Sequence, residues 1–152
     1  MQKFRILGHA LSLFLFLSSS CAATSYSQEK LPLKKLSLCG QNYIAWVAAK
    51  DEDRTKGLMN FRPLKKHEAM LFVFENERPL SFWMKNVSYD LDIAYFDKNK
   101  KLVSFLTMKA TSPLMKEDSL PAYPSKGVAM YAVEVRAGNL KGLGPRCRLS
   151  FK

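Results

Sequence analysis

The sequence has few of the residues from which metal centres and nucleophilic active sites are usually built. It holds 2 histidines and 3 cysteines, and the cysteines stand far apart rather than in a cluster. It has neither a Gly-x-Ser-x-Gly turn nor a glycine-rich phosphate loop. We therefore expect no metal site, no bound cofactor, and no serine or cysteine nucleophile.

Apolar runs long enough to cross a membrane are also missing. The run from Ala10 to Leu17 is shorter than the roughly 20 apolar residues that a membrane-spanning helix needs, and nothing later is long enough. Lys3 and Arg5 precede this run and small residues around Cys21 follow it, which is the order of a signal peptide. We expect residues 1–20 to direct export, and the remaining chain to act in the periplasm or cell envelope.

Two cleavage sites fit this leader. Processing just before Cys21 would make that cysteine a lipidated N-terminus, whereas cleavage after Ala23 would release an unmodified chain. We favour the lipoprotein, because Leu17-Ser18-Ser19-Ser20-Cys21 is similar to a lipobox. The membrane, reached through this lipid, is then an expected partner.

The other two cysteines, Cys39 and Cys147, stand near opposite ends of the expected domain. An oxidising compartment favours paired cysteines, so we expect a disulfide between them, with two free thiols as the alternative. A bridge that closes a loop of about 100 residues stabilises the folded state by about 4 to 5 kcal/mol in the chain-entropy treatment. Pairing these two also leaves Cys21 over, which agrees with its proposed lipidation.

The chain is basic, with a formal net charge of +11, and loss of Lys3 and Arg5 with the leader lowers this to +9. The basic residues are scattered and lack the interleaved aromatic residues of a nucleic-acid module, so we expect no nucleic-acid partner. An anionic envelope polymer or lipid is a better counterpart for this charge. The alternative is a solvated surface that only keeps the protein soluble.

Residues 21–35 are polar and predict a flexible tether, and residues 36–152 predict a single domain. Short apolar runs separated by turn residues indicate a mainly β (α+β) fold, a small rolled or barrel-like sheet with one short helix. The eight expected strands are Leu36–Cys39, Tyr43–Ala48, Met70–Phe74, Leu80–Lys85, Leu91–Phe96, Leu102–Met108, Met130–Val135 and Arg146–Phe151. A helix is expected at Asp51–Leu58, capped by Asp51, and a long loop at Lys109–Lys126.

Two acidic residues interrupt apolar strands. Asp92 shares one strand face with Ala94, and Glu134 lies between Val133 and Val135. Because an unpartnered carboxylate is strongly disfavoured in an apolar interior, we expect each of these two acids to have a partner.

Six residues form the candidate ligand-binding site: Arg62, Trp83, Lys85, Asn86, Asp92 and Glu134. A few polar groups beside a flat apolar wall suit a small ligand, provided that their strands are neighbours. The alternative is purely structural, with Arg62 or Lys85 neutralising one of the two acids and Asn86 bracing a turn.

Several motifs together resemble the domain of unknown function 192 family. They are Gly57-Leu58-Met59 with Arg62, Met70-Leu71-Phe72-Val73-Phe74, Phe82-Trp83-Met84-Lys85-Asn86, Leu91-Asp92-Ile93, and Val133-Glu134 followed by Gly138. The resemblance runs from Tyr43 to Phe151, with departures at Ala69, Val87, Asp90 and Arg146-Cys147. It implies a small prokaryotic protein, often exported or lipid-anchored, with a compact β-rich fold and no established activity.

Three functions remain open from the sequence. We favour an exported, lipid-anchored envelope protein that acts as a binding or interaction domain. The second is an envelope enzyme in which Asp92 and Glu134 serve as an acid and base pair. The third is a purely structural or accessory envelope protein.

Overall fold

The structure is a computed structural model in which residues 30–152 are described. The expected signal peptide, Cys21 and most of the tether lie outside the described residues. The elements are β1 Leu33–Leu38, β2 Gln41–Ala48, α1 Asp51–Lys56, β3 Glu68–Phe82, β4 Leu91–Phe96, β5 Leu102–Met108, η2 Glu117–Ser119, β6 Tyr123–Arg136 and β7 Leu149–Phe151. The mainly β fold with one short helix is confirmed.

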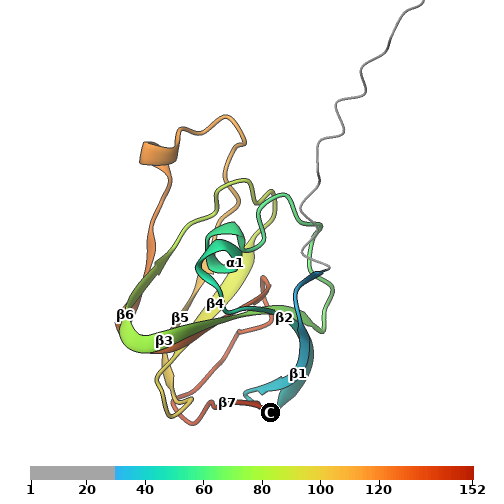
Figure 1. Ribbon diagram of the computed structural model, residues 1–152, viewed down its shortest axis with the longest axis vertical. Helices are drawn as coiled ribbons and strands as arrows, with labels where there is room; N and C mark the ends of the chain where they lie inside the picture. Colours follow the sequence, from blue (N-terminus) through green and yellow to red (C-terminus); the bar gives the residue numbers. More distant parts are fainter. Residues whose placement is uncertain (1–29) are drawn as a thin grey trace, which may run out of the picture.

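One curled sheet of 7 strands, in the order β5-β4-β6-β3-β2-β1-β7, forms the domain (Figure 1). Its two edge strands meet at one point, where Lys101 bridges Arg148 and the Leu149 amide donates to the Lys100 carbonyl at 3.0 Å. The sheet is therefore a half-barrel that is pinned at one corner. Such contact between edges also leaves less strand edge free for pairing with other chains.

The expected disulfide between Cys39 and Cys147 is confirmed. Their Cα atoms are 4.5 Å apart, and the bridge spans a sequence separation of 108 residues. The Cys39 amide also donates to the carbonyl of Arg148 at 2.9 Å. The covalent link thus fastens the turn after β1 to the segment that enters β7, close to the pinned corner.

Helix α1 connects β2 to β3, which pair in parallel, whereas the other neighbouring strands are antiparallel. It ends before the expected Leu58, because Gly57 adopts a positive φ of 46°. The expected cap was wrong: Lys50 is the N-cap residue, without a side-chain hydrogen bond, and Asp51 pairs with Arg54 instead.

Several strand boundaries differ from the expectation, and the expected strand Arg146–Phe151 is shortened to β7, which begins only at Leu149. Strand β1 begins already at Leu33, because backbone pairing with β2 extends into the polar segment. The two strands expected at Met70–Phe74 and Leu80–Lys85 are one long strand, β3, with its register broken between Val73 and Arg78. Strand β6 begins at Tyr123, which shortens the expected loop. Both long strands thus pair through segments that are too polar to be recognised as strands.

The sheet is buried on both of its faces. Inside the curl, a core forms around Leu71, Phe96 and Val133, and on the other face a second core forms around Phe72 and Tyr95 beneath α1 and its adjoining loops (Figure 1). Strand β4 is buried along its whole length, as its position between β5 and β6 requires. Among residues 30–152, no helix is long and apolar enough to cross a membrane.

Candidate functional site

The six candidate residues separate into two groups. Trp83, Lys85 and Glu134 line one cavity between α1, β3 and β6, whereas Arg62, Asn86 and Asp92 do not. The cavity has a volume of about 270 Å³. Its lining consists of Asp51, Arg54, Thr55, Lys56, Gly57, Leu58, Met59, Phe72, Phe74, Arg78, Ser81, Phe82, Trp83, Lys85, Val87 and Glu134.

Asp92 lies inside the curled sheet, where its hydrogen bonds link separate parts of the fold. Its carboxylate accepts hydrogen bonds from the Thr107 hydroxyl at 2.7 Å, the Gly138 amide at 2.7 Å and the Leu140 amide at 3.0 Å. Asp92 is only 3% exposed. A carboxylate with three donors has the partners that burial demands, and it ties the turn after β6 to strands β4 and β5.

Arg62 and Asn86 also have structural contacts. Arg62 forms two hydrogen bonds with the Glu68 carboxylate, at 2.6 and 2.9 Å, and these hold the pKa of Glu68 below its usual value. Its guanidinium lies 5.6 Å from the ring centre of Trp46. Asn86 adopts a positive φ of 55° in a turn, and its carbonyl accepts the Asn60 amide at 2.8 Å. Asn86 thus lies in a turn, the position that the structural alternative gave it, whereas Arg62 pairs with Glu68 rather than with either of the two interior acids.

Glu134 has a different environment from Asp92. In β6 it pairs with Met70 of β3 and Ile93 of β4, and it is 4% exposed on the α1 face of the sheet. Burial raises the pKa of its carboxyl to about 8. Burial is the cause of this shift, and no cation among residues 30–152 pairs with the ionised form.

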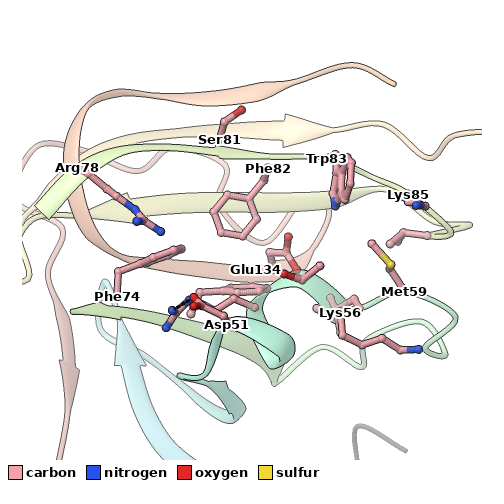
Figure 2. Close-up of a pocket in the computed structure, with 16 residues that line it drawn as sticks. Asp51, Lys56, Met59, Phe74, Arg78, Ser81, Phe82, Trp83, Lys85 and Glu134 are labelled. Carbon is pink, nitrogen blue, oxygen red and sulfur yellow. Dashed lines mark hydrogen bonds and ion pairs between the residues drawn. The ribbon is translucent and has the colours of Figure 1, made fainter. Parts of the chain in front are cut away.

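The Glu134 carboxyl opens into the cavity. Within residues 30–152 it forms no hydrogen bond or ion pair, although every fully buried side-chain nitrogen or oxygen in that range has a hydrogen-bond partner. Its oxygens are therefore not fully enclosed by protein. Figure 2 places the side chain at the centre of the cavity, with Phe82 and Trp83 on one side of it.

Aromatic rings form the apolar wall around this acid. Phe72 and Phe82 contact each other edge to face at 4.8 Å, and Phe82 contacts Tyr95 in the same manner at 5.8 Å. Trp83 continues the wall outward, where it is 36% exposed. Edge-to-face contacts of this kind stabilise the wall beyond the burial of the rings alone.

Basic groups surround the mouth of the cavity. Arg54 donates to the carbonyls of Ala49 and Val73, the latter at 2.8 Å, and is fixed by these bonds. The guanidinium groups of Arg54 and Arg78 lie 4.9 and 5.0 Å from the ring centre of Phe74. At the other end, the Lys85 ammonium lies 5.3 Å from the ring centre of Trp83. Figure 2 shows these two side chains at the same end of the cavity.

Several site residues were missed from the sequence, namely Arg54, Arg78, Phe72, Phe74 and Phe82. The two pieces of β3 were predicted, and with them the apolar character of the three phenylalanines. Arg78, however, reaches the cavity because the register break after Val73 turns the strand. The sequence carries no signal for that break beyond the polar run 75–78.

The arrangement does not bring Asp92 and Glu134 together as the alternative of an acid and base pair requires. Ile93 lies opposite Glu134, so the neighbouring Asp92 points to the other face of the sheet. The two carboxylates are thus separated by the sheet itself. No group of three or more His, Cys, Asp or Glu side chains that could hold a metal ion occurs in the described part of the chain.

The fold is similar to two solved bacterial structures. A proposed transcription regulator from Sinorhizobium meliloti 1021 is 25% identical, with a TM-score of 0.69, over 80% of this chain and 95% of that one. A protein of unknown function from Novosphingobium aromaticivorans DSM 12444 is 21% identical, with a TM-score of 0.67, over 79% of this chain and 86% of that one. The second likeness concerns the fold alone.

A search of curated proteins found no match. Residues 35–147 match the sequence profile of DUF192, described as an uncharacterized ACR. This match covers most of the chain, including every strand from β2 to β6 and the whole lining of the cavity. The chain therefore belongs to the DUF192 family.

Proposed function

We propose that this protein is exported and lipid-anchored in the cell envelope, and that its cavity beneath α1 binds a small organic ligand. One observation carries the binding proposal. Glu134 is a nearly buried acid that opens into a cavity with an aromatic wall, and it has no partner among residues 30–152.

The energetics support a ligand more than a packing role. An acid in this position costs stability, because burial disfavours its charged form and residues 30–152 supply no compensating ion pair. Asp92, on the opposite face, has three donors that stabilise its charge. A buried polar group that destabilises a fold whose other core residues are apolar and well packed is a common mark of a functional site.

The envelope location rests on the leader and on the cysteines. The signal-like residues 1–20 and the lipobox-like segment ending at Cys21 support export and anchoring. The disulfide between Cys39 and Cys147 is of a kind that persists in oxidising compartments.

A ligand screen by two-dimensional amide NMR of the processed protein tests the binding proposal. Cell-wall fragments, envelope lipids and small metabolites are added singly, and a true ligand shifts the amide signals of Gly57 and Val87, which line the cavity. Thr55→Trp, on the cavity side of α1, should block these shifts. Glu52→Trp, which is exposed on the same helix but does not line the cavity, is the matched control. Shifts that persist in Thr55→Trp would show binding elsewhere and overturn the proposal.

A second candidate function is proton transfer by Glu134 on a bound substrate. A pKa of about 8 is close to the working pH, which suits a general acid. Asp92 cannot assist on this face, so the enzyme hypothesis now depends on Glu134 alone. A product that forms with the native protein and is lost in Glu134→Gln, while the ligand still binds, would favour this candidate.

A further inference from the structure

We propose that the ligand is an organic anion with a compact apolar body, whose acidic group lies at the basic mouth of the cavity, to which Arg78 and Lys85 contribute, and whose uncharged oxygen accepts a hydrogen bond from Glu134. This inference rests on the proposed function, because it names the chemistry of the ligand for that same cavity. Charge, aromatic contacts, hydrogen bonding and size each support it.

Charge favours an anion at the mouth. The lining holds four basic residues, Arg54, Lys56, Arg78 and Lys85, against the acids Asp51 and Glu134. Among residues 30–152, Arg78 forms no ion pair. Within the described part of the chain, Lys85 pairs only with Glu117, whose side chain is 56% exposed. An exposed pair of this kind contributes little, so the anionic group of a ligand can replace Glu117.

Aromatic contacts disfavour a cationic ligand. An ammonium ligand usually binds against the open face of an aromatic ring. Here Phe74 already has the guanidinium groups of Arg54 and Arg78 within about 5 Å, and Trp83 has the ammonium of Lys85. A cation entering the mouth would therefore meet like charges rather than free ring faces.

Hydrogen bonding with Glu134 determines which kind of ligand atom can lie inside the cavity. With its raised pKa, Glu134 is largely protonated at neutral pH, and a protonated carboxyl has one O–H to donate. Burying a neutral ligand oxygen against this donor satisfies both groups, whereas a ligand with only carbon there would leave the acid without a partner.

The volume of the cavity suits a ligand whose apolar body is one ring with a short substituent. A cavity of about 150 Å³ can hold benzene, and this one has about 270 Å³. Phe72, Phe82 and Met59 then contact the ring, and the two ends of the ligand reach Glu134 and the basic mouth. Figure 2 shows Glu134 lying between Arg78 at one end of the cavity and Lys85 at the other.

Three probes with the same phenolic ring and different charges test this inference. They are 4-hydroxyphenylacetate, the neutral alcohol tyrosol and the cation tyramine, each titrated by amide NMR at pH 6.5. We expect 4-hydroxyphenylacetate to bind at least about tenfold more tightly than tyramine, with tyrosol between them. Arg78→Gln and Lys85→Gln should each weaken the anion about fivefold, whereas the matched exposed controls Arg136→Gln and Lys141→Gln should leave its affinity unchanged.

The Glu134 contact has its own readout. Glu134→Gln keeps an N–H donor, so its affinity for 4-hydroxyphenylacetate should stay within about threefold of the native protein at pH 6.5. As pH rises through about 8, the native protein should lose affinity, because the ionised acid cannot donate and repels the anion. The Gln variant should show no such loss.

The outcomes distinguish the two proposals. Tightest binding by tyramine, or an affinity for the anion that rises with pH, would overturn the anion inference while leaving the cavity as a binding site. If none of the three probes shifts the amides of Gly57 and Val87, the anion inference fails. If no compound in the wider ligand screen shifts these two amide signals either, the proposed function fails as well.

Discussion

Asp92 and Glu134 lie on neighbouring strands and point to opposite faces of the sheet. The side chain of Asp92 enters the core inside the curl and accepts three hydrogen bonds, and that of Glu134 faces the cavity beneath α1. Two acids that look alike in sequence therefore differ in role. Asp92 contributes to the fold, whereas Glu134 costs stability and is available to a ligand.

Asp92→Asn should lower the free energy of unfolding by about 2 to 4 kcal/mol, because the amide cannot accept from all three donors and leaves a buried N–H without a partner. Thr107→Val should cost about 1 kcal/mol, because it removes one neutral donor and keeps the shape of the side chain. Urea denaturation at pH 7 measures both. Glu75→Gln, at an exposed position of β3, is the control and should be neutral. A neutral Asp92→Asn would contradict the structural role.

Stability should depend on pH through Glu134. Its pKa is raised from 4.5 to about 8 in the folded protein, so between these values the folded state binds more protons than the unfolded state. The free energy of unfolding should therefore fall as pH rises from about 5 to 8, with a slope from this group approaching about 1.4 kcal/mol per pH unit, and level off above pH 8.

Glu134→Gln isolates this effect, because it removes the titrating group and keeps the shape. The variant should match the native protein near pH 5 and be more stable at pH 9, as measured by urea denaturation across the range. Equal pH dependence in both proteins would show that Glu134 has an ordinary pKa.

Loss of the disulfide should destabilise the domain strongly. The bridge closes a loop spanning 108 residues, for which the chain-entropy treatment gives about 4 to 5 kcal/mol. Cys39→Ser with Cys147→Ser should lose stability of this order in thermal and urea unfolding. Peptide mapping without reductant should find the two cysteines linked in protein purified from the periplasm, and free thiols at both positions there would refute the bridge.

Anchoring through Cys21 should be visible by fractionation in the native host. The protein should partition with membranes, and Cys21→Ser should release it or block its processing. The intact mass of the mature chain should include the lipid. A mature chain that starts at Thr24 without modification would instead support ordinary cleavage after Ala23.

The strands richest in apolar residues were predictable because each is a short apolar run bounded by turn residues. Leu91–Phe96 was recovered with its boundaries, and the pattern placed Asp92 on the same face as Ala94 and Phe96. The segments not predicted as strand were polar stretches of β3 and β6, which are held by backbone pairing and lack the apolar residues that indicate a strand.

By itself, the sequence determined the apolar parts of the strands, the position of the short helix, the burial of both interior acids and the cysteines available for pairing, because these follow from local pattern and composition. Only the tertiary structure decided that Arg78, Lys85 and Glu134 share one cavity, while Asp92 is bound on the other face. The physical reason is that a cavity forms where a register break in β3, the end of β6 and the crossover helix α1 meet. Those contacts join residues far apart in the chain, and local periodicity does not encode which strands become neighbours.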